Sequence, residues 1–167
     1  MNLNEYQAQA LTTCLPSARS REYLIPGIVA EVGELYGKRA KSVRDDWAED
    51  RLQHELAFEY GDVAWMTAIL LDVEGVHTIW AQHHPRAMSF TGGRVDPFQA
   101  LLSRVVILAN ADFHDYVLTE AQGLWKDLEQ HCQTVTGWSF EDVLKANLDK
   151  LASRQQRGVL TGAGDNR

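Results

Sequence analysis

Two pairs of acidic residues are the part of this sequence best suited to chemistry. Glu31 and Glu34 are separated by two residues, and so are Glu59 and Asp62. Because three residues make nearly one turn of an α-helix, both acids of a pair lie on one face of their helix. Two such helices laid antiparallel bring four carboxylates together, a concentration of charge that needs cations to neutralise it. The spacing therefore predicts a site for Mg²⁺ and, through the metal, for phosphate groups.

A solvated helix face is the simplest alternative explanation of one acidic pair. Both pairs, however, interrupt apolar residues at helical spacing: Glu31 stands between Ile28 and Val32, and Asp62 directly precedes Val63. Solvated acids seldom take such positions. Carboxylate oxygens without a neighbouring Cys or His select Mg²⁺, or Mn²⁺ in its place, over zinc or copper. We expect about two or three ions at the site.

Apolar residues at helical spacing predict the helices that carry these acids. A first helix is expected over residues 3–13. A second is expected over 27–43, entered from Pro26, which is a favourable first-turn residue. A third is expected to begin at Asp50 as its cap and to continue to Gly75. Each acidic pair then lies inside a helix.

The remaining sequence predicts a loop and three further helices. Residues 76–97 are treated as a loop, and Pro97 opens the next apolar-periodic run. A further helix is expected over about 117–135, ended by Gly137, and Ser139 is expected to cap the last helix rather than to act as a nucleophile. Residues 158–167 contain three glycines and are expected to be extended. No polar and apolar alternation is long enough for a strand, so the chain is predicted to be all-α.

Glycines inside the predicted helices need an explanation, because each costs about 1 kcal/mol relative to alanine. Gly33 and Gly37 lie in the helix of the first acidic pair, and Gly61 lies within the second pair. We expect close approach between helices at the site to offset this cost.

Composition limits the classes of protein to which the chain belongs. Its 167 residues are 45% hydrophobic and 23% charged, which suits one globular domain over 1–167. The net charge of -7 argues against binding to nucleic acid polymers, which requires a basic face, but is compatible with one metal-bridged nucleotide. Cys14 and Cys132 form no metal or redox motif. No apolar run approaches the roughly 18 residues of a membrane span and the first residues lack a signal-peptide pattern, so we expect no membrane partner and a cytoplasmic location.

The residues around the acids resemble a known family. Residues 27–41 (GIVAEVGELYGKRAK) and 59–65 (EYGDVAW) are similar to the MazG-like branch of the all-α nucleoside triphosphate pyrophosphohydrolases, of bacterial and phage type. Segments between Val143 and Arg167 are similar to the ending of many members. The resemblance covers about residues 3–75 and 140–167.

The resemblance implies a helical bundle that forms a homodimer or a dimer of dimers. It also implies hydrolysis of nucleoside triphosphates between the α and β phosphates, giving a nucleoside monophosphate and pyrophosphate. By this analogy the four acids hold Mg²⁺, while Asn147 and Lys150, which match the family's Asn-x-x-Lys, contact the nucleotide. Further phosphate candidates are Lys38, Lys41 and Arg154.

Cleavage of a phosphoanhydride needs charge neutralisation more than covalent catalysis, which suits such a metal site. Either Glu31 or Glu34 is expected to take the proton of the attacking water, and the spacing leaves this choice open.

Recognition of the base needs aromatic or amide groups near the metals, and the candidates are Tyr6, Gln7, Tyr23, Trp47 and Asn147. Trp47 and Tyr23 are of a type more often found in cores and interfaces. His77, His83 and His84 are interpreted as an exposed loop rather than a metal cluster.

One segment departs from the family pattern. Shorter members continue almost directly from the helix of the second acidic pair to the last helix, whereas residues 76–135 intervene in this chain. We therefore expect core helices over about 3–75 and 139–157, an additional helical insertion over 76–135, and a Gly-rich tail over 158–167.

The leading hypothesis is a Mg²⁺-dependent pyrophosphohydrolase, for example a phage-type enzyme that acts on dGTP or another purine deoxynucleotide. A house-cleaning hydrolase of non-canonical nucleotides is the alternative within this class. From a different class, the acids of a non-catalytic helical oligomer would form a cation-bridged interface or bind a regulatory nucleotide.

Overall fold

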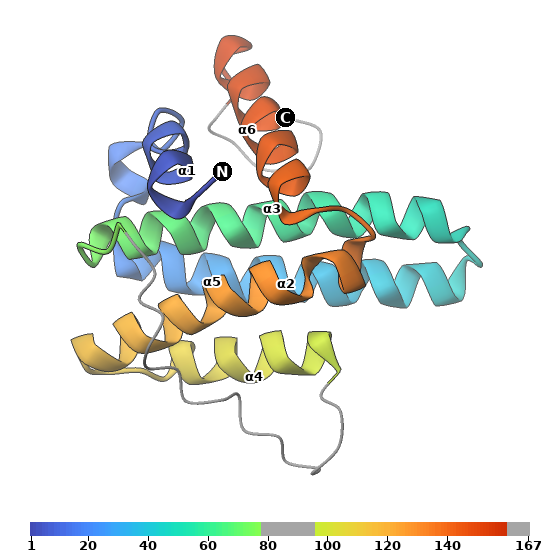
Figure 1. The fold of residues 1–167 in the computed structure, drawn as a ribbon, viewed down its shortest axis with the longest axis horizontal. Coiled ribbons are helices and arrows are strands. Elements are labelled where there is room, and N and C mark those ends of the chain that lie inside the picture. Colours follow the sequence, from blue (N-terminus) through green and yellow to red (C-terminus); the bar gives the residue numbers. More distant parts are fainter. Residues whose placement is uncertain (78–95, 160–167) are drawn as a thin grey trace.

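The chain is all-helical in a computed structural model, which describes residues 1–77 and 96–159. In these ranges it has six α-helices, one short 3-10 helix and no strand, which confirms the predicted all-α class (Figure 1). The elements are α1 (Leu3–Ala10), η1 (Pro16–Ala18), α2 (Arg21–Arg44), α3 (Glu49–Val73), α4 (Pro97–Ala109), α5 (His114–Thr136) and α6 (Phe140–Gln156).

The long helices α2 and α3 form an antiparallel hairpin at the centre of the fold (Figure 1). Helices α4 and α5 pack on one side of this hairpin, and α1 and α6 pack on the other. Helix α3 contacts α1, α2, α5 and α6, and α4 joins the bundle through α2 and α5. The two acidic pairs lie on the two helices of the hairpin, at the level where α6 crosses α3.

Two helix starts differ from the prediction. Helix α2 begins at Arg21, so Pro26 lies inside the helix instead of opening it. Leu24 is fully buried and continues the apolar stripe of α2 toward the N-terminus, and this packing outweighs the one backbone hydrogen bond that a proline removes. Helix α3 begins at Glu49 after Ala48, so Asp50 is a first-turn residue rather than the cap. A carboxylate in that turn is favoured by the positive end of the helix dipole.

Other helix ends follow the predicted signals. Pro97 opens α4 as predicted, and Asp96, which was not predicted, caps the helix by accepting a hydrogen bond from the Phe98 amide. Gly137 ends α5 in the left-handed region at φ 72°, a conformation that favours glycine. Ser139 caps α6 by accepting from the Asp142 amide.

One helix is shorter than predicted, and much of the predicted loop and tail lies outside the described residues. Helix α1 ends at Ala10, and residues 11–13 form turns instead of continuing the helix. Most of the predicted loop and of the Gly-rich tail, including His83 and His84, lies in 78–95 and 160–167, outside the described residues.

All six α-helices contribute to one hydrophobic core. Leu101 of α4 and Leu124 and Leu128 of α5 are almost completely buried in it, so the two helices within 76–135 are part of the same packed unit as the hairpin. Whether this segment is an insertion relative to shorter proteins stays a prediction. No helix within the described ranges combines the length and the apolar character that crossing a membrane requires.

A buried ion network joins α4 to α5. The Arg104 guanidinium donates to Glu120 at 2.9 Å and to Asp127 at 2.5 Å, and its side chain is only 5% exposed. Gly123 faces this guanidinium, and any side chain there would collide with it. The glycine therefore creates the space in which the charged group is paired.

Candidate metal centre

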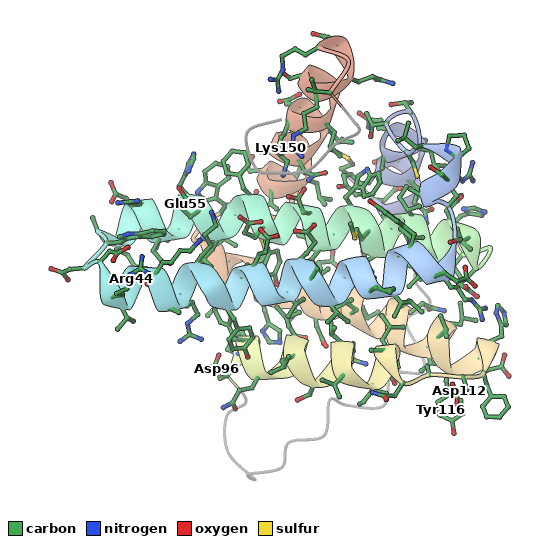
Figure 2. All side chains as sticks on the ribbon, turned by 180° about the vertical axis from the view of Figure 1, so that it is seen from behind. Arg44, Glu55, Asp96, Asp112, Tyr116 and Lys150 are labelled. Atoms are coloured by element: carbon green, nitrogen blue, oxygen red, sulfur yellow. The ribbon has the colours of Figure 1, made fainter. Side chains whose placement is uncertain are left out.

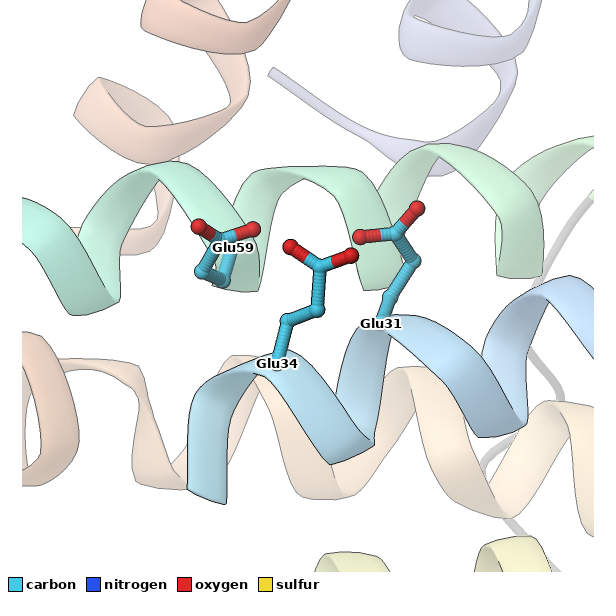
Figure 3. A group of neighbouring side chains, drawn as sticks. All are labelled: Glu31, Glu34 and Glu59. Carbon is cyan, nitrogen blue, oxygen red and sulfur yellow. The ribbon is translucent and has the colours of Figure 1, made fainter. Parts of the chain in front are cut away.

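Three glutamates converge between α2 and α3. One carboxylate oxygen from each of Glu31, Glu34 and Glu59 lies within 4.8 Å of the others (Figure 3). Glu31 and Glu34 leave α2 one turn apart, and Glu59 reaches toward them from α3 (Figure 3). The structure thus brings together three of the four predicted metal ligands, from both predicted pairs. We call Glu31, Glu34 and Glu59 the acid cluster.

The acid cluster extends from the protein interior to the surface. Glu34 is exposed, Glu31 is partly buried, and the Glu59 side chain is 13% exposed. Burial, together with the negative charges of Asp62, Glu34 and Glu59, raises the pKa of Glu31 from 4.5 to about 8. Burial also raises the pKa of Glu59, against the opposing effect of Lys38. Ionisation of Glu31 and of Glu59 is therefore unfavourable without additional positive charge.

Asp62, the fourth predicted ligand, is held by α6. Lys150 Nζ donates to both carboxylate oxygens of Asp62, at 2.6 Å to Oδ1 and 2.5 Å to Oδ2. Asn147 Nδ2 donates to Oδ1 at 2.8 Å. Asp62 nevertheless stands close enough to the cluster to raise the pKa of Glu31. The predicted Asn147 and Lys150 therefore meet the acids through Asp62, where α6 packs on α3. Figure 2 shows Lys150 on α6, beside the hairpin.

Lys38 provides a second cation, on the α2 side of the cluster. Its ammonium group lies 2.6 Å from a carboxylate oxygen of Glu55 and 3.2 Å from one of Glu59. The cluster is thus flanked by two lysines from different helices, Lys38 and Lys150, with side chains 20% and 17% exposed. Both are partly accessible and close enough to the acids to meet an anion bound there.

Other predicted contacts lie farther from the acids. Lys41 is exposed on α2, one turn beyond Lys38, and Arg154 lies one turn beyond Lys150 on α6. Trp47 occupies the turn between α2 and α3, where the Arg51 guanidinium lies 4.0 Å from its ring centroid. From the cluster to the end of α2 is about 15 Å along the helix axis, so the structure does not bring Trp47 to the acids.

Three further candidates for base recognition lie apart from the cluster or are buried. Tyr6 is 0% and Gln7 is 1% exposed, and the Gln7 amide donates to the backbone oxygens of Ala68 and Val76. Tyr23 is exposed near the start of α2, two helical turns before Glu31. Gln7 therefore links α1 to the end of α3.

The glycines near the site have two different environments. A Cβ at Gly61 would lie 2.9 Å from Asn147 Cβ, so the expected close approach between helices is confirmed there. At Gly33 and Gly37 a Cβ would have no described atom of another part of the chain within 4 Å, so the same expectation is wrong for these two within the described residues. Both glycines leave the surface of α2 open beside the cluster.

Two site features were missed by the sequence reasoning. Glu55 lies one turn before Glu59 on α3, and this extension of the acidic stripe at i, i+4 spacing is visible in the sequence. The hydrogen bond from the Tyr6 hydroxyl to Asn147 joins residues 141 positions apart, and no local signal indicates it.

Comparisons with known proteins do not assign the chain to a family: no family model, no curated protein and no solved structure matches it. Its function must therefore be argued from the acid cluster and the groups around it.

Proposed function

We propose that this chain is a Mg²⁺-dependent nucleoside triphosphate pyrophosphohydrolase of the MazG-like type. It cleaves a ribo- or deoxyribonucleoside triphosphate between the α and β phosphates, releasing a nucleoside monophosphate and pyrophosphate. The observation that carries the proposal is the convergence of three carboxylate oxygens within 4.8 Å, from both predicted acidic pairs. Asp62 beside them and a lysine on each flank supply the further groups that a metal-bound phosphate chain needs.

The donor set fits a hard divalent cation. All the candidate ligand atoms are carboxylate oxygens, the type that Mg²⁺ and Mn²⁺ prefer. Burial and mutual repulsion keep the pKa of Glu31 at about 8, and a cation among these oxygens would remove that repulsion. When bound, the ions neutralise the triphosphate, lower the pKa of the attacking water and stabilise the pyrophosphate leaving group.

The protein's own groups then have separate tasks. Glu31, Glu34, Glu59 and Asp62 hold the positive charge in place, and either Glu31 or Glu34 takes the proton of the water. Lys150 turns from Asp62 toward a phosphate oxygen, because it is the partly accessible partner of that acid. Lys38 sits at the opposite flank and contacts phosphate from there. No covalent intermediate is required, since positioning and charge stabilisation account for phosphoryl transfer.

A substrate panel with product identification tests this proposal. Purified protein with Mg²⁺ is expected to release pyrophosphate, not orthophosphate, from at least one natural or modified triphosphate. Turnover of dGTP, dATP, dCTP and dUTP compared with oxidised dGTP distinguishes a phage-type purine enzyme from a house-cleaning hydrolase. Absence of pyrophosphate across the whole panel would contradict the proposal.

We also propose that the chain self-associates as a homodimer. Val29 of α2 and Leu102 and Val106 of α4 are 44%, 43% and 53% exposed, and exposed apolar groups of this kind favour association. The solvent-facing Glu34 supports the second functional class, in which the acids bridge subunits through a cation. In that case Mg²⁺ would change the molecular mass in solution without any hydrolysis, which light scattering beside the substrate panel would detect.

A further inference from the structure

A buried chain of hydrogen bonds runs from α1 through α6 to Asp62 on α3. The Tyr6 hydroxyl donates to Asn147 Oδ1 at 3.0 Å, and Asn147 Nδ2 donates to Asp62 Oδ1 at 2.8 Å. Tyr6 is 0% and Asn147 is 2% exposed. Both polar atoms of the Asn147 amide therefore have protein partners and almost no contact with solvent.

The chemistry of the three groups fixes the direction of each bond. An ionised carboxylate only accepts hydrogen bonds, so the amide nitrogen of Asn147 must face Asp62. The amide oxygen must then face Tyr6, whose hydroxyl is left to act as the donor. Without that hydroxyl the amide oxygen has no partner in this chain of bonds, and only the repulsion between two oxygens at Asp62 opposes a flipped amide. Tyr6 and Asp62 thus set the orientation of Asn147 together.

Packing places Asn147 against the residue next to Asp62. A Cβ at Gly61 would lie 2.9 Å from Asn147 Cβ, closer than such atoms approach in proteins. Glycine at this position is what allows α6 to come near enough for the amide to reach Asp62. The hydrogen bond is therefore built into the crossing of α3 and α6.

Asn147 and Lys150 differ in how they hold Asp62. Oδ1 of Asp62 accepts from both residues, whereas Oδ2 accepts from Lys150 alone. The Lys150 side chain is 17% exposed and belongs to a flexible cation, while Asn147 is enclosed. When Lys150 leaves, Oδ2 becomes free and Oδ1 stays fixed.

We propose that Asn147 is a positioning residue for Asp62, oriented by the Tyr6 hydroxyl, and that it does not contact the nucleotide. It fixes the plane of the Asp62 carboxylate so that Oδ2 serves as a metal ligand once the metal displaces Lys150 from it. This inference rests on the proposed function, because it assigns Asp62 to the metal site. It reassigns Asn147, which the family resemblance implies as a nucleotide contact.

The test compares two buried tyrosines by their effect on metal binding. Tyr6→Phe removes the hydroxyl that orients Asn147, while Tyr60→Phe removes a hydroxyl that donates to the Leu128 backbone oxygen at the same 3.0 Å. Mn²⁺ binding is measured by electron paramagnetic resonance without nucleotide, and circular dichroism monitors folding. Tyr6→Phe is expected to weaken Mn²⁺ binding about tenfold, the size of effect seen when a group that orients a metal ligand is lost. Tyr60→Phe should stay within about twofold of wild type, since its hydroxyl lies outside the metal site.

A double variant strengthens the test. Asn147→Ala should weaken Mn²⁺ binding at least as much as Tyr6→Phe, and adding Tyr6→Phe to it should cause no further loss, because both act through one chain of bonds. Steady-state kinetics at saturating Mg²⁺ should show an unchanged KM for the nucleotide in Tyr6→Phe. A titration of activity with Mg²⁺ should show that the variant needs a higher Mg²⁺ concentration than the wild type.

The outcomes separate this inference from the proposed function. Normal Mn²⁺ binding by Tyr6→Phe with a raised KM for nucleotide would overturn the positioning role, as would equal losses in the two tyrosine variants. Weaker Mn²⁺ binding by Tyr6→Phe alone, in a protein that hydrolyses no triphosphate, would support the positioning role and refute the hydrolase. Absence of Mn²⁺ binding by the wild type would overturn both.

Discussion

Replacing Glu31 with glutamine should change how the stability of the metal-free protein depends on pH. Burial and the charges of Asp62, Glu34 and Glu59 raise the pKa of Glu31 from 4.5 to about 8 in the folded protein. In the unfolded chain the same carboxyl ionises near its ordinary value. Between these two values the folded state binds more protons, so the free energy of unfolding should fall as pH rises from about 4.5 to about 8.

The size of this effect follows from the same two values. One pKa unit corresponds to about 1.4 kcal/mol, so the whole difference is at most about 5 kcal/mol. Glu31 retains some contact with water, and we expect screening to reduce the loss to about 2–3 kcal/mol. Glutamine has nearly the same shape and stays neutral, so Glu31→Gln should lose much less over this range. The raised pKa of Glu59 leaves a smaller decline of the same sign in the variant.

Urea unfolding followed by circular dichroism measures this, at about pH 5 and about pH 8.5 with a chelator. At the higher pH, Glu31→Gln should be the more stable protein, and added Mg²⁺ should stabilise the wild type far more than the variant. Glu129→Gln, at an exposed position of α5, serves as the control and should follow the wild type. Parallel declines of wild type and Glu31→Gln would refute the reasoning, because the charge on Glu31 would then have no influence.

Four other substitutions have defined outcomes. Glu34→Gln should reduce pyrophosphate release by at least about 100-fold in the substrate assay, with the helical circular dichroism near wild type, since the proposed function assigns this exposed acid to the metal and not to the fold. Gly61→Ala should lower the free energy of unfolding by about 1–3 kcal/mol, because its Cβ meets Asn147, whereas Gly33→Ala should raise it by about 0.5–1 kcal/mol in the same urea assay. Arg104→Ala leaves two largely buried carboxylates of α5 unpaired and should cost about 3–5 kcal/mol in urea unfolding near neutral pH, and less in acid.

The features that could be predicted from the sequence are those that depend on the helical spacing of apolar residues. The stripe formed by Ile28, Val32 and Leu35 determines which face of α2 is buried, and all three side chains are at most 1% exposed. With that face fixed, the i, i+3 spacing places Glu31 and Glu34 together on the neighbouring face, toward α3. The all-α class and the convergence of acids from both pairs could therefore be predicted from the sequence.

Contacts between segments far apart in the sequence could not be predicted in the same way. The sequence misplaces the start of α2 because Pro26 is a favourable first-turn residue, whereas in the structure the helix begins at Arg21 and buries Leu24; only the packing decides between these two signals. The partners of Asp62 depend on where α6 crosses α3, and the orientation of Asn147 depends on a tyrosine in α1. No local pattern carries that information.

Glycine shows the same division between local and long-range causes. The cost of a glycine in a helix is a local quantity, so the sequence correctly marked Gly33, Gly37 and Gly61 as needing an explanation. Only the neighbours show which of them lies in a close helix crossing, and among the described atoms this is Gly61 alone of the three.

The most direct test of the central claim is a crystal structure of the protein with bound Mn²⁺. We predict anomalous density between α2 and α3, about 2.1 Å from carboxylate oxygens of Glu31, Glu34 and Glu59, with Oδ2 of Asp62 facing the metal. Clear density for the four acids with no anomalous signal among them, in crystals saturated with Mn²⁺, would contradict the claim that these acids form a metal centre.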